Sequence, residues 1–491
     1  MILSAQQQRN WDAQTIEVEP IRSIDLMERA SKRWLEHARP YLNKNAITVF
    51  AGFGNNGGDA LVIARLLATE GYEISVVLCF FGKTPSQDAQ TNLERLSRVN
   101  VKLLELQSTS DLDALLINPN SLLIDGIFGT GLRSGLQGEF AQLVHKINAS
   151  HSFVLSIDIP SGLLSDTLNT KGDEIVKARH TISFQAAKLS FLMPESEPCF
   201  GSWTVIDIGL HSGFLEEITI ENHLLTLGQI KALIVPRHKF SHKGSYGHAM
   251  IASGVSATIG ASILASRAAI SSGAGLTTLL SDEKGINLSY PELMISRLDS
   301  IKSPDRVTFC IGPGLGTNEV ARTKLVNVLK TATKPMVLDA DALNLLSNEV
   351  ELLKTLPKQS VLTPHPKELE RLIGTTDSSF EQLEKAREFA IEHDVVLLVK
   401  RAHTVIIGND GQVYFNSTGN NGLAKGGSGD VLSGIISALL AQGYKPVSSA
   451  LIGVYVHGLA ADLAVKQNAY SSLTPEKVIS HLSSAFKQLG I

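Results

Sequence analysis

Cysteine is scarce in this sequence of 491 residues, which contains only Cys79, Cys199 and Cys310. Their spacing fits no zinc or redox motif, and three cysteines cannot form a disulfide framework. Few cysteines are typical of a reducing compartment, so we expect a cytoplasmic protein. The N-terminus also lacks the basic segment and apolar run of a signal peptide, which agrees with that expectation.

Strong charge of one sign is absent as well. The chain has 44 Lys and Arg against 48 Asp and Glu, a formal net charge of −4. Without a basic cluster, the sequence predicts no binding to nucleic acid or to an anionic membrane. Two long apolar stretches, 251–280 and 431–465, are interrupted by charged residues such as Arg267 and Asp462. They indicate buried helices rather than membrane spans.

Apolar segments of strand length alternate with helical segments along the whole chain. A helix is predicted over 23–35, and the alternation predicts an α/β fold with parallel sheets. Strand candidates are 46–50, 71–80, 121–125, 153–158, 181–184, 203–207, 248–253, 307–311, 335–339, 360–362 and 395–400, followed by a hairpin-like run over 403–415. The pattern weakens near 209–226, so we expect one domain over 1–218 and a second over 228–491.

A glycine-rich segment, GFGNNGGD at 52–59, lies between a predicted strand and a predicted helix over 60–69. Backbone amides at a helix start bind anions, and glycines let a ligand approach the main chain. The spacing is not that of the dinucleotide fingerprint, and no Gly-Lys-Ser/Thr follows as in a Walker loop. A simple turn with Asn in left-handed positions is the alternative interpretation.

Two further strand ends carry acidic residues. Asp125 precedes GTGLRSG, and Asp158 precedes IPSG. Ligands bind at the carboxyl ends of parallel strands, so these groups should converge with the glycine-rich segment. Oxygens of Asn56, Asp125 and the region of Ser161 could hold a hard monovalent cation, and Asp158 could transfer a proton. The alternative is that each Asp caps a helix.

The second half contains GNNGLAKGGSGDVLSG at 419–434, ahead of an apolar helix predicted over 431–440. Gly426, Gly427 and Gly429 could present amides to a phosphate at the start of that helix. Asp430 would then lie in the first turn, where a general base could deprotonate a hydroxyl that attacks phosphorus. The alternative is a turn in which Asp430 interacts favourably with the helix dipole.

Other blocks follow predicted strands of the second half. They are GPGLG at 312–316, DADALN at 339–344, TPHPKE at 363–368 and KRAHT at 400–404. His365 lies between two prolines at a strand end, where a ligand-binding and a structural interpretation are equally open. The last block could reach a nucleotide phosphate or ribose.

The first half resembles the NAD(P)HX epimerase family. The resemblance rests on LMERAS, GFGNNGGDA, LLIDGIFGTGL, LSIDIPSG and FQAAKLSFL, in that order, and covers roughly residues 1–215. It implies a Rossmann-like three-layer sandwich, potassium held by Asn56, Asp125 and Ser161, and catalysis by Asp158. The implied substrate contacts are Asn55, Asn56, Gly57, Gly58, Asp59, Gly129, Thr130, Gly131, Leu132, Arg133, Ser134 and Gly135. Arg133 stands in a variable position, Ala60 replaces a usual Gly, and Lys188, in the last block, has no assigned function.

The second half resembles the ribokinase-like ADP-dependent NAD(P)HX dehydratases. HKGSYGH, GASILASRAAISSGAGL, GPGLG, DADALN, TPHPKE and GGSGD carry the resemblance, over roughly residues 228–491. It implies a ribokinase-like α/β domain with Asp430 as the catalytic residue, ADP as co-substrate and Mg²⁺. Implied substrate contacts are Ala261, Gly314 and His365, and implied nucleotide contacts are Lys400, Arg401, Ala402, His403, Thr404 and Gly429. The chain departs from the family pattern at Asn421, Lys425 and Arg401.

Together the two resemblances imply repair of hydrated NADH and NADPH. The first half would interconvert the R and S epimers of NADHX and NADPHX, and the second would dehydrate the S epimer at the expense of ADP, releasing phosphate and AMP. We expect a homo-oligomer with small-molecule substrates as its only partners. Two alternatives stay open: a ribokinase-like kinase acting on a small alcohol, and a nucleotide-sensing module without catalysis.

Overall fold

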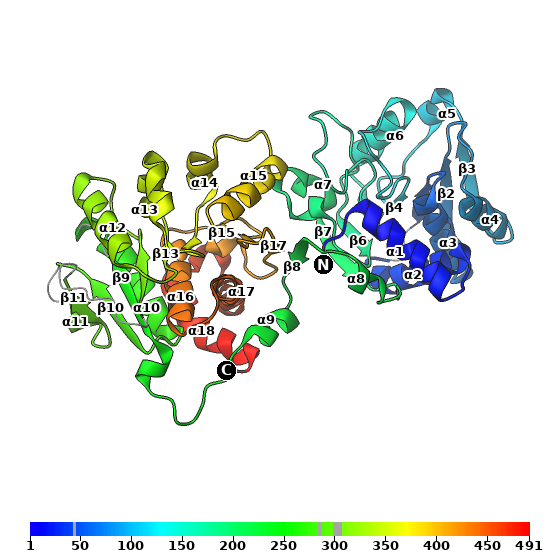
Figure 1. Cartoon of the computed structure of the whole chain (residues 1–491). Coiled ribbons are helices and arrows are strands. Elements are labelled where there is room, and N and C mark those ends of the chain that lie inside the picture. Colours follow the sequence, from blue (N-terminus) through cyan, green and yellow to red (C-terminus); the bar gives the residue numbers. More distant parts are fainter. Residues whose placement is uncertain (43–45, 253, 255, 283–285, 298–306) are drawn as a thin grey trace. The chain divides into compact units, whose positions relative to one another are not determined.

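The chain folds into two α/β units (Figure 1). The computed structural model describes residues 1–42, 46–252, 254, 256–282, 286–297 and 307–491. One unit comprises Met1–Ile220 with Ser378–Phe380, and the other comprises Glu221–Asp377 with Glu381–Ile491. The interval 219–227 includes a short strand that joins the sheet of the second unit.

In the first unit, the described residues form a parallel sheet of seven strands in the order β3-β2-β1-β4-β5-β6-β7. The strands are β1 (Ile47–Ala51), β2 (Ile74–Cys79), β3 (Lys102–Leu106), β4 (Leu122–Gly126), β5 (Phe153–Ile157), β6 (His180–Phe184) and β7 (Ser202–Ile206). The helices are α1 (Ala5–Val18), α2 (Ser23–Ala38), α3 (Asn55–Thr69), α4 (Gln87–Leu96), α5 (Thr109–Ala114), α6 (Gly138–Ala149), α7 (Glu197–Phe200) and α8 (Phe214–Glu217).

Alternating side chains of β1 enter different cores. Val49 packs in the same cluster as Trp34 and Leu61, from α2 and α3, whereas Phe50 packs in the cluster that contains Leu143 of α6. Successive residues of a strand point to opposite faces, so both faces of this sheet are covered by helices. The predicted three-layer α/β sandwich is confirmed.

The strand order of this sheet reverses between β1 and β4. The loops that leave the carboxyl ends of these two strands diverge to opposite sides there, which is where ligands bind in open α/β sheets. The start of α3 and the segment that follows β4 therefore lie at the switch point, and both were expected to bind substrate.

In the second unit, the described residues form a sheet of ten strands in the order β11-β10-β9-β12-β13-β14-β15-β16-β17-β8. The pairs from β11 to β15 and the pair β17–β8 are parallel, and β15–β16 and β16–β17 are antiparallel. The strands are β8 (Asn222–Leu224), β9 (His248–Ala252), β10 (Leu276–Leu280), β11 (Met294–Ser296), β12 (Val307–Ile311), β13 (Val337–Leu338), β14 (Val361–Leu362), β15 (Val396–Val399), β16 (Val405–Ile407) and β17 (Val413–Phe415).

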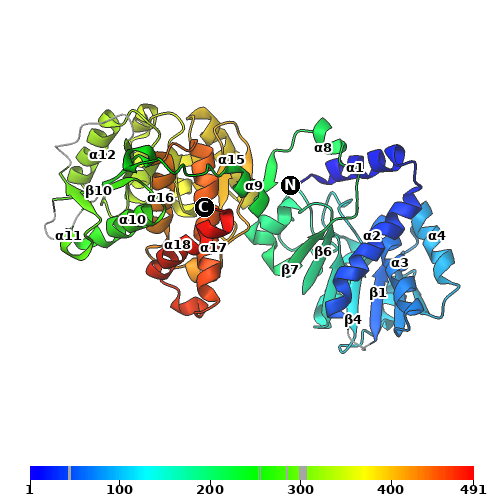
Figure 2. The same ribbon diagram turned by 90° about the horizontal axis from the view of Figure 1, so that it is seen from below.

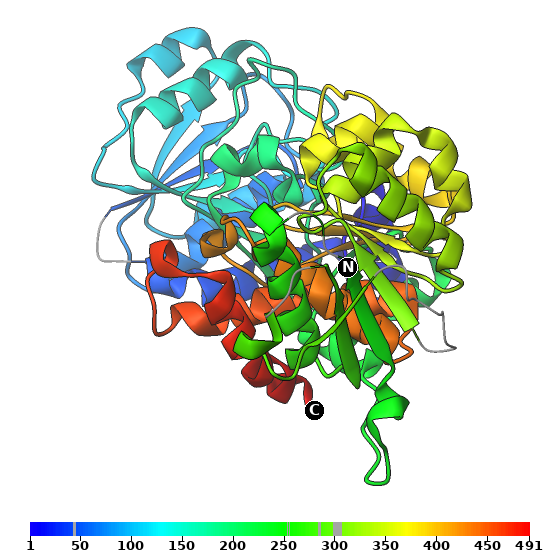
Figure 3. The same ribbon diagram turned by 90° about the vertical axis from the view of Figure 1, so that its left-hand side faces the viewer.

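Helices cover both faces of this second sheet. Figures 1 and 3 show α12–α15 on one face and α10 with α16–α18 on the other. The helices are α9 (Leu227–Leu233), α10 (Ile259–Ser271), α11 (Ile286–Ser289), α12 (Glu319–Thr331), α13 (Asp341–Asn348), α14 (Pro366–Ile373), α15 (Ser379–Glu392), α16 (Ser428–Ala441), α17 (Pro446–Val465) and α18 (Pro475–Leu489). The order reverses between β9 and β12, so the GPGLG segment after β12 lies at a second switch point.

Among the described helices, α17 is long and apolar enough to cross a membrane. However, 72% of its most apolar window is buried inside the protein, where it packs beside α16 and α18 (Figure 2). Helix α17 is therefore a core helix, as its interrupted sequence predicted.

Two details differ from the sequence predictions. The predicted loop over 52–59 ends at Gly54, because Asn55 already begins α3. The predicted helix over 431–440 begins earlier, at Ser428, which leaves Asp430 in its first turn as expected. In each segment some glycines precede the helix and others, such as Gly57 and Gly429, lie in its opening turn.

Candidate active sites

Asn56, Asp125 and Ser161 meet around the main chain of Phe128. The Asn56 Nδ2 donates to the Phe128 carbonyl at 3.0 Å, and the Phe128 N–H donates to the Ser161 Oγ at 2.8 Å. The Ser161 N–H in turn donates to Asp125 Oδ2 at 2.9 Å, as does the Ser156 hydroxyl at 2.8 Å. The three residues expected to hold potassium are thus close neighbours.

The carboxylate of Asp125 is 1% exposed. Burial raises its pKa, and hydrogen bonds from Ser161 and Ser156 oppose that shift. Among the described residues, no group of three or more His, Cys, Asp or Glu side chains could hold a metal ion. One buried carboxylate surrounded by hydroxyl, amide and carbonyl oxygens is instead the donor set that suits a singly charged hard cation.

Asp158 follows β5 in a left-handed conformation, with φ of 65°. Its Oδ1 accepts a hydrogen bond from the Phe184 N–H at 3.0 Å and lies 2.7 Å from the Nζ of Lys188. The Lys188 side chain is 0% exposed and also donates to the carbonyls of Phe184 and Ala186, each at 3.2 Å. A fully buried ammonium and a strained backbone both fix this carboxylate in place.

Two more carboxyl groups lie in the electrostatic field of Asp158. Asp59, in α3, accepts a hydrogen bond from Ser31 Oγ at 3.0 Å, and burial raises its pKa well above the ordinary value. Asp12, in α1, has its pKa raised to about 6 by burial and by the Asp158 charge, against the opposing effect of Lys188. Sequence reasoning missed Asp12, because it lies on a helix and not at a strand end.

The segment after β4 contributes unevenly to this site. A Cβ on Gly129 would lie 3.3 Å from Asn56, so this glycine is beside the cation cluster. Leu132 is partly buried against the core next to α6. Arg133 and Ser134 are exposed, and the described part of the structure shows no bond from them to the cluster. Their predicted substrate contacts stay predictions.

In the second unit, the Asp339 carboxylate is bonded to side chains from two other elements. The Lys400 Nζ, at the end of β15, lies 2.6 Å from Asp339 Oδ1, and the Ser433 hydroxyl of α16 donates to Oδ2 at 2.7 Å. Asp339 itself is 1% exposed at the end of β13. The three residues tie the carboxyl ends of β13 and β15 to the start of α16.

Asp430 lies one helical turn before Ser433 and is half-buried. Burial and the neighbouring Asp339 charge raise its pKa to about 6, while Lys400 lowers it. A Cβ on Gly429 would lie 3.3 Å from the Lys400 Nζ, whereas Gly426 is exposed with open space beside it. Gly427 begins the helix with φ of 92°, a conformation that favours glycine. The main-chain amides at the start of α16, the Lys400 ammonium and the Asp430 carboxyl group therefore lie together at one solvent-accessible position.

The GPGLG segment packs closely on the start of α10. The Ser262 hydroxyl donates to the Pro313 carbonyl at 2.7 Å, and the Thr258 hydroxyl donates to the Gly314 carbonyl at 2.8 Å. Gly314 has φ of 65°, and a Cβ there would lie 2.3 Å from the Thr258 carbonyl oxygen. Ala261 lies in the first turn of α10, between the two residues that bond this segment, and the substrate contacts predicted for Ala261 and Gly314 stay predictions.

Several other predicted residues make local contacts. The Nδ1 of His365 accepts hydrogen bonds from the N–H groups of Lys367 and Glu368, at 3.1 and 3.2 Å, and so caps α14. Arg401 donates to Gln382 of α15, and Lys425 donates to the Ser471 carbonyl. The Lys425 ammonium therefore makes a main-chain contact away from Asp430, and the Arg401 guanidinium binds a protein side chain.

The remainder of the KRAHT block follows β15 and leads into β16. The Nδ1 of His403 lies 3.0 Å from the Asn416 carbonyl, and the Thr404 hydroxyl donates to the Arg401 carbonyl at 3.2 Å. Ala402 is exposed. Only Lys400 of this block is bonded to Asp339, so the nucleotide contacts predicted for the other four residues stay predictions.

Two residues near Asp430 were not singled out from the sequence. His457, in α17, is buried with its Nε2 3.4 Å from the Ser428 Oγ, and burial lowers its pKa to about 4. Ser433 bonds Asp339, as described above. Both lie inside apolar helices, where the sequence offers no indication that a polar residue faces a site.

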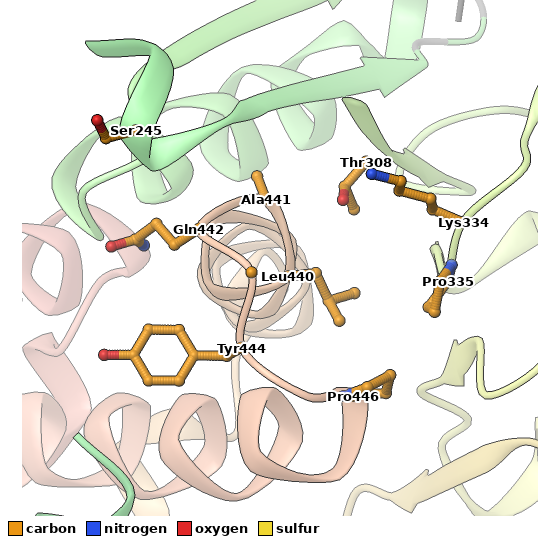
Figure 4. A pocket seen from close by; sticks show the side chains of 10 residues that line it. Ser245, Thr308, Lys334, Pro335, Leu440, Ala441, Gln442, Tyr444 and Pro446 are labelled. Carbon is orange, nitrogen blue, oxygen red and sulfur yellow. The ribbon is translucent and has the colours of Figure 1, made fainter. Parts of the chain in front are cut away.

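A pocket of about 480 Å³ lies elsewhere in the second unit (Figure 4). Its lining includes Thr308 and Lys334, and Leu440 to Tyr444 at the carboxyl end of α16. Asp430 is at the amino end of the same helix, about 15 Å or more away along its axis. This pocket is therefore not the place where Asp430 acts.

Comparison with known families agrees with the two-unit organisation. Residues 23–190 match the family described as YjeF-related protein N-terminus, and residues 249–484 match the family described as NAD(P)H-hydrate dehydratase. The bifunctional NAD(P)H-hydrate repair enzyme Nnr of Moorella thermoacetica is 36% identical over 96% of this chain and 93% of its own length.

Solved structures resemble the second unit. A ribokinase-like superfamily protein from Enterococcus faecalis aligns with a TM-score of 0.50 and 29% identity, over 55% of this chain and 98% of that protein. An ADP/ATP-dependent NAD(P)H-hydrate dehydratase from Bacillus subtilis, co-crystallised with ATP and Mg²⁺, is 31% identical over 54% of this chain and 98% of its own, with a TM-score of 0.48. The chain belongs to the family of bifunctional NAD(P)H-hydrate repair enzymes, with an epimerase half and a nucleotide-dependent dehydratase half that together restore NADH and NADPH from their hydrates.

Proposed function

We propose that Asp430 is the general base of the dehydratase half. The observation that carries this proposal is the position of its carboxyl group, in the first turn of α16, next to amide donors and the Lys400 ammonium. A pKa of about 6 leaves the carboxylate mostly ionised at neutral pH and makes it a stronger base than an ordinary aspartate.

Hydroxide is a poor leaving group, so dehydration needs an activated oxygen. Asp430 accepts the proton of the substrate hydroxyl while that oxygen attacks the terminal phosphorus of ADP, and AMP departs. The ring nitrogen then expels phosphate, and loss of a proton from the adjacent carbon restores the double bond. The N–H groups of Gly427 and Gly429, with Lys400, stabilise the charge that develops on the phosphate oxygens.

The residues around Asp430 also fit Mg²⁺. Asp339 is occupied by Lys400 and Ser433, whereas the carboxylate of Asp430 has no hydrogen bond among the described residues. Mg²⁺ prefers few protein ligands together with phosphate oxygens and water. When bound, the ion would offset phosphate charge, and Asp430 would be its protein ligand or a neighbour of one. We propose the substrate at Ala261, Gly314 and His365, and the adenine nucleotide along Lys400–Thr404 and Gly429.

In the epimerase half we propose Asp158 as a proton-transfer group. Support comes from its fixed carboxylate at a strand end, 2.7 Å from a buried ammonium and close enough to Asp59 to act on its charge. The substrate would lie along Asn55–Asp59 and Gly129–Gly135. Asn56, Asp125 and Ser161 would hold potassium, which would supply a fixed positive charge for the substrate's phosphates or carboxamide.

Three further assignments belong to the proposal. We assign epimerisation to residues 1–218 and dehydration to residues 228–491. The protein acts in the cytoplasm, in keeping with its three free cysteines. It forms a homo-oligomer, which light scattering of the purified protein would test.

The experiment that tests both sites uses Asp430→Asn and Asp158→Asn in the full chain. With S-NADHX, ADP and Mg²⁺, Asp430→Asn should slow the return of NADH absorbance by roughly 100-fold or more. The same variant should epimerise R-NADHX at the normal rate, because the two sites lie in different units. Asp158→Asn should show the opposite pattern.

The matched control is Glu392→Gln, an exposed carboxylate of α15 that should leave both rates unchanged. Normal dehydration by Asp430→Asn would overturn the assignment of the base. The product separates dehydration from a kinase reaction: a kinase would accumulate a phosphoester, whereas this enzyme should release free phosphate as NADH appears.

A further inference from the structure

Helix α1 is anchored beside the epimerase site. Ile2 pairs with Ala187, the residue before Lys188, and the Trp11 indole N–H donates to the His211 carbonyl at 2.8 Å. The Trp11 ring also stacks on Phe214 with 5.8 Å between ring centroids. Figure 2 shows α1 beside α8, as this stacking requires. The helix is therefore a fixed part of the first unit, next to the segment that carries Lys188.

Asp12, adjacent to Trp11, lies in the field of both Asp158 and Lys188. The Asp12 charge also helps to raise the pKa of Asp59. Its carboxyl group is half-buried, and in the described residues no hydrogen bond or ion pair reaches it. Because the residue is only half-buried and its carboxyl oxygens have no partner among the described residues, these oxygens are available to a ligand.

One turn earlier on the same face of α1, the Nε2 of Gln8 is buried and has no hydrogen-bond partner among the described residues. Residues four apart share one face of a helix. A donor without an acceptor and a carboxyl group without a donor thus stand together on α1. This face of α1 is built to contact a polar molecule.

The reaction needs two proton transfers. Water adds to the enamine double bond of the reduced ring at the carbon next to the ring nitrogen. Inversion at that carbon begins when an acid gives its proton to the hydroxyl, the C–O bond breaks, water leaves and the nitrogen lone pair forms an iminium bond. Water then adds to the other face, its proton goes to a base, and the electron pair returns to nitrogen. One carboxylic acid and one carboxylate carry out this inversion, after which the former carboxylate holds the proton. Proton exchange with solvent water then restores both starting forms.

We propose that Asp12 is the second proton-transfer residue of the epimerase site and acts as the partner of Asp158. The inference rests on the proposed function of Asp158. It adds a second carboxyl group, which comes from helix α1 and not from a strand end. The Lys188 ammonium lies 2.7 Å from Asp158 Oδ1, whereas among the described residues no cation lies within ion-pair distance of Asp12, which leaves Asp12 as the group to carry the proton. Asp59 does not replace Asp12, because the Asp59 carboxyl group is buried and accepts a hydrogen bond from the Ser31 hydroxyl.

The pH dependence follows from the groups around Asp12. Those that act on it are Asp158 and Lys188, from the segments after β5 and β6, and Asp59 of α3 lies in the same field. Its pKa of about 6 means that the acid form is lost as the pH rises above 6. The epimerase kcat/KM of the intact protein should therefore fall between pH 6 and 8. This pH-dependent decrease should be absent from Asp12→Asn.

The test measures conversion of purified R-NADHX to the S epimer by the full-length protein without any nucleotide, so that dehydration is off. Asp12→Asn should lower kcat by about 100-fold or more and leave KM within about threefold, because a proton transfer and not binding is lost. Asp12→Glu restores an acid and should regain part of the rate. Glu17→Gln, an exposed carboxylate on the same helix, should behave as the unchanged protein.

Epimerisation by Asp12→Asn within about threefold of the normal rate, with Asp158→Asn inactive, would overturn this inference and leave Asp158 in place. If both variants stayed active, the proposed epimerase site itself would be wrong. Should Asp12→Asn fail to fold, the pH profile of the intact protein decides: a flat profile between pH 6 and 8 overturns the inference.

Discussion

Lys188 is an extreme case of a buried charge, since its side chain is 0% exposed and its ammonium lies 2.7 Å from Asp158 Oδ1. Removing water from an ammonium is costly, and only the facing carboxylate and two main-chain carbonyls offset that cost. The pair therefore contributes little net stability. What it does provide is a carboxylate in a fixed position, as the proposed proton transfer requires.

Lys188→Met should thus affect stability and activity together. Breaking a buried pair by removing one partner costs about 3–5 kcal/mol, because Asp158 would stay buried without its counterion. We expect the free energy of unfolding of the first unit to fall by that amount, which lowers the urea midpoint, and epimerisation to be lost with dehydration unchanged. Lys32→Met, on an exposed pair with Glu28, is the control and should cost well under 1 kcal/mol. Equal midpoints for the two variants would contradict this interpretation of Lys188.

Asp430 shows the reverse relation between stability and function. Burial raises its pKa from an ordinary 3.8 to about 6, so folding favours the protonated form. Between these values the folded state binds more protons than the unfolded state, and the free energy of unfolding falls as pH rises. Above pH 6 the folded protein carries a charge that is better solvated in the unfolded chain.

Asp430→Asn should therefore stabilise the second unit at pH 7.5, by about 1–2 kcal/mol once screening of this half-exposed group is allowed for. At pH 4, where the folded wild-type carboxyl group is protonated, the two proteins should unfold almost together. Urea denaturation at both pH values measures the difference. A variant less stable than the wild type at pH 7.5 would show that Asp430 is structural.

At the scale of elements, α3 illustrates why glycine is placed inside a helix. Gly57 lies in its first turns, where Ala would normally be preferred by about 1 kcal/mol. A Cβ on Gly57, however, would lie 1.9 Å from the Gly52 carbonyl oxygen, which is main chain and cannot turn away. The helix start is thus pressed against the end of β1, close to the cation cluster.

Gly57→Ala should consequently destabilise the first unit by about 2 kcal/mol or more, the opposite sign from its effect in an open helix. It should also impair epimerisation, because Asn56 would move with the backbone. Gly54→Ala is the matched control: its backbone is extended and a Cβ there meets nothing within 4 Å. Thermal unfolding that ranks the two variants equally would contradict the packing argument.

Burial alone did not decide which strands were predictable from sequence: β7, which has exposed residues, was located to within one residue, whereas the mostly buried β10 was missed. Continuous apolar segments located β1 and β12 to within one residue. The strand β3 was missed because its residues 102–105 are exposed and carry Lys and Glu. Acidic residues at strand ends, Asp125 and Asp158, were found because parallel strands converge there.

Groups that reach the sites from helices escaped prediction for a different reason. Asp12 is one polar residue on an amphipathic helix, and nothing in its local sequence distinguishes an inward carboxylate from an outward one. Ser433 and His457 are hidden within apolar helices. Only the tertiary packing of α1, α16 and α17 shows what these side chains approach.

For the whole molecule, the two proposed sites lie at the carboxyl ends of strands in two separate sheets. The proposed epimerase site includes the β1/β4 switch point, and the proposed dehydratase site lies where the ends of β13 and β15 meet the start of α16. Each unit has its own core and its own carboxyl group that we propose as the proton-transfer residue. Neither sheet contributes a strand to the other. The S epimer is product of one site and substrate of the other, so chemistry couples the halves even if each works alone.

A mixture of Asp158→Asn and Asp430→Asn proteins should therefore restore the conversion of R-NADHX to NADH in the presence of ADP. The first variant supplies dehydration and the second supplies epimerisation, with the S epimer diffusing between them. Each variant by itself should produce NADH from R-NADHX only at the background rate. With each variant at the wild-type molarity, we expect a rate within about threefold of wild type. A mixture no faster than the sum of its two components would mean that the intermediate must pass between sites of one protein, because free diffusion would then contribute nothing.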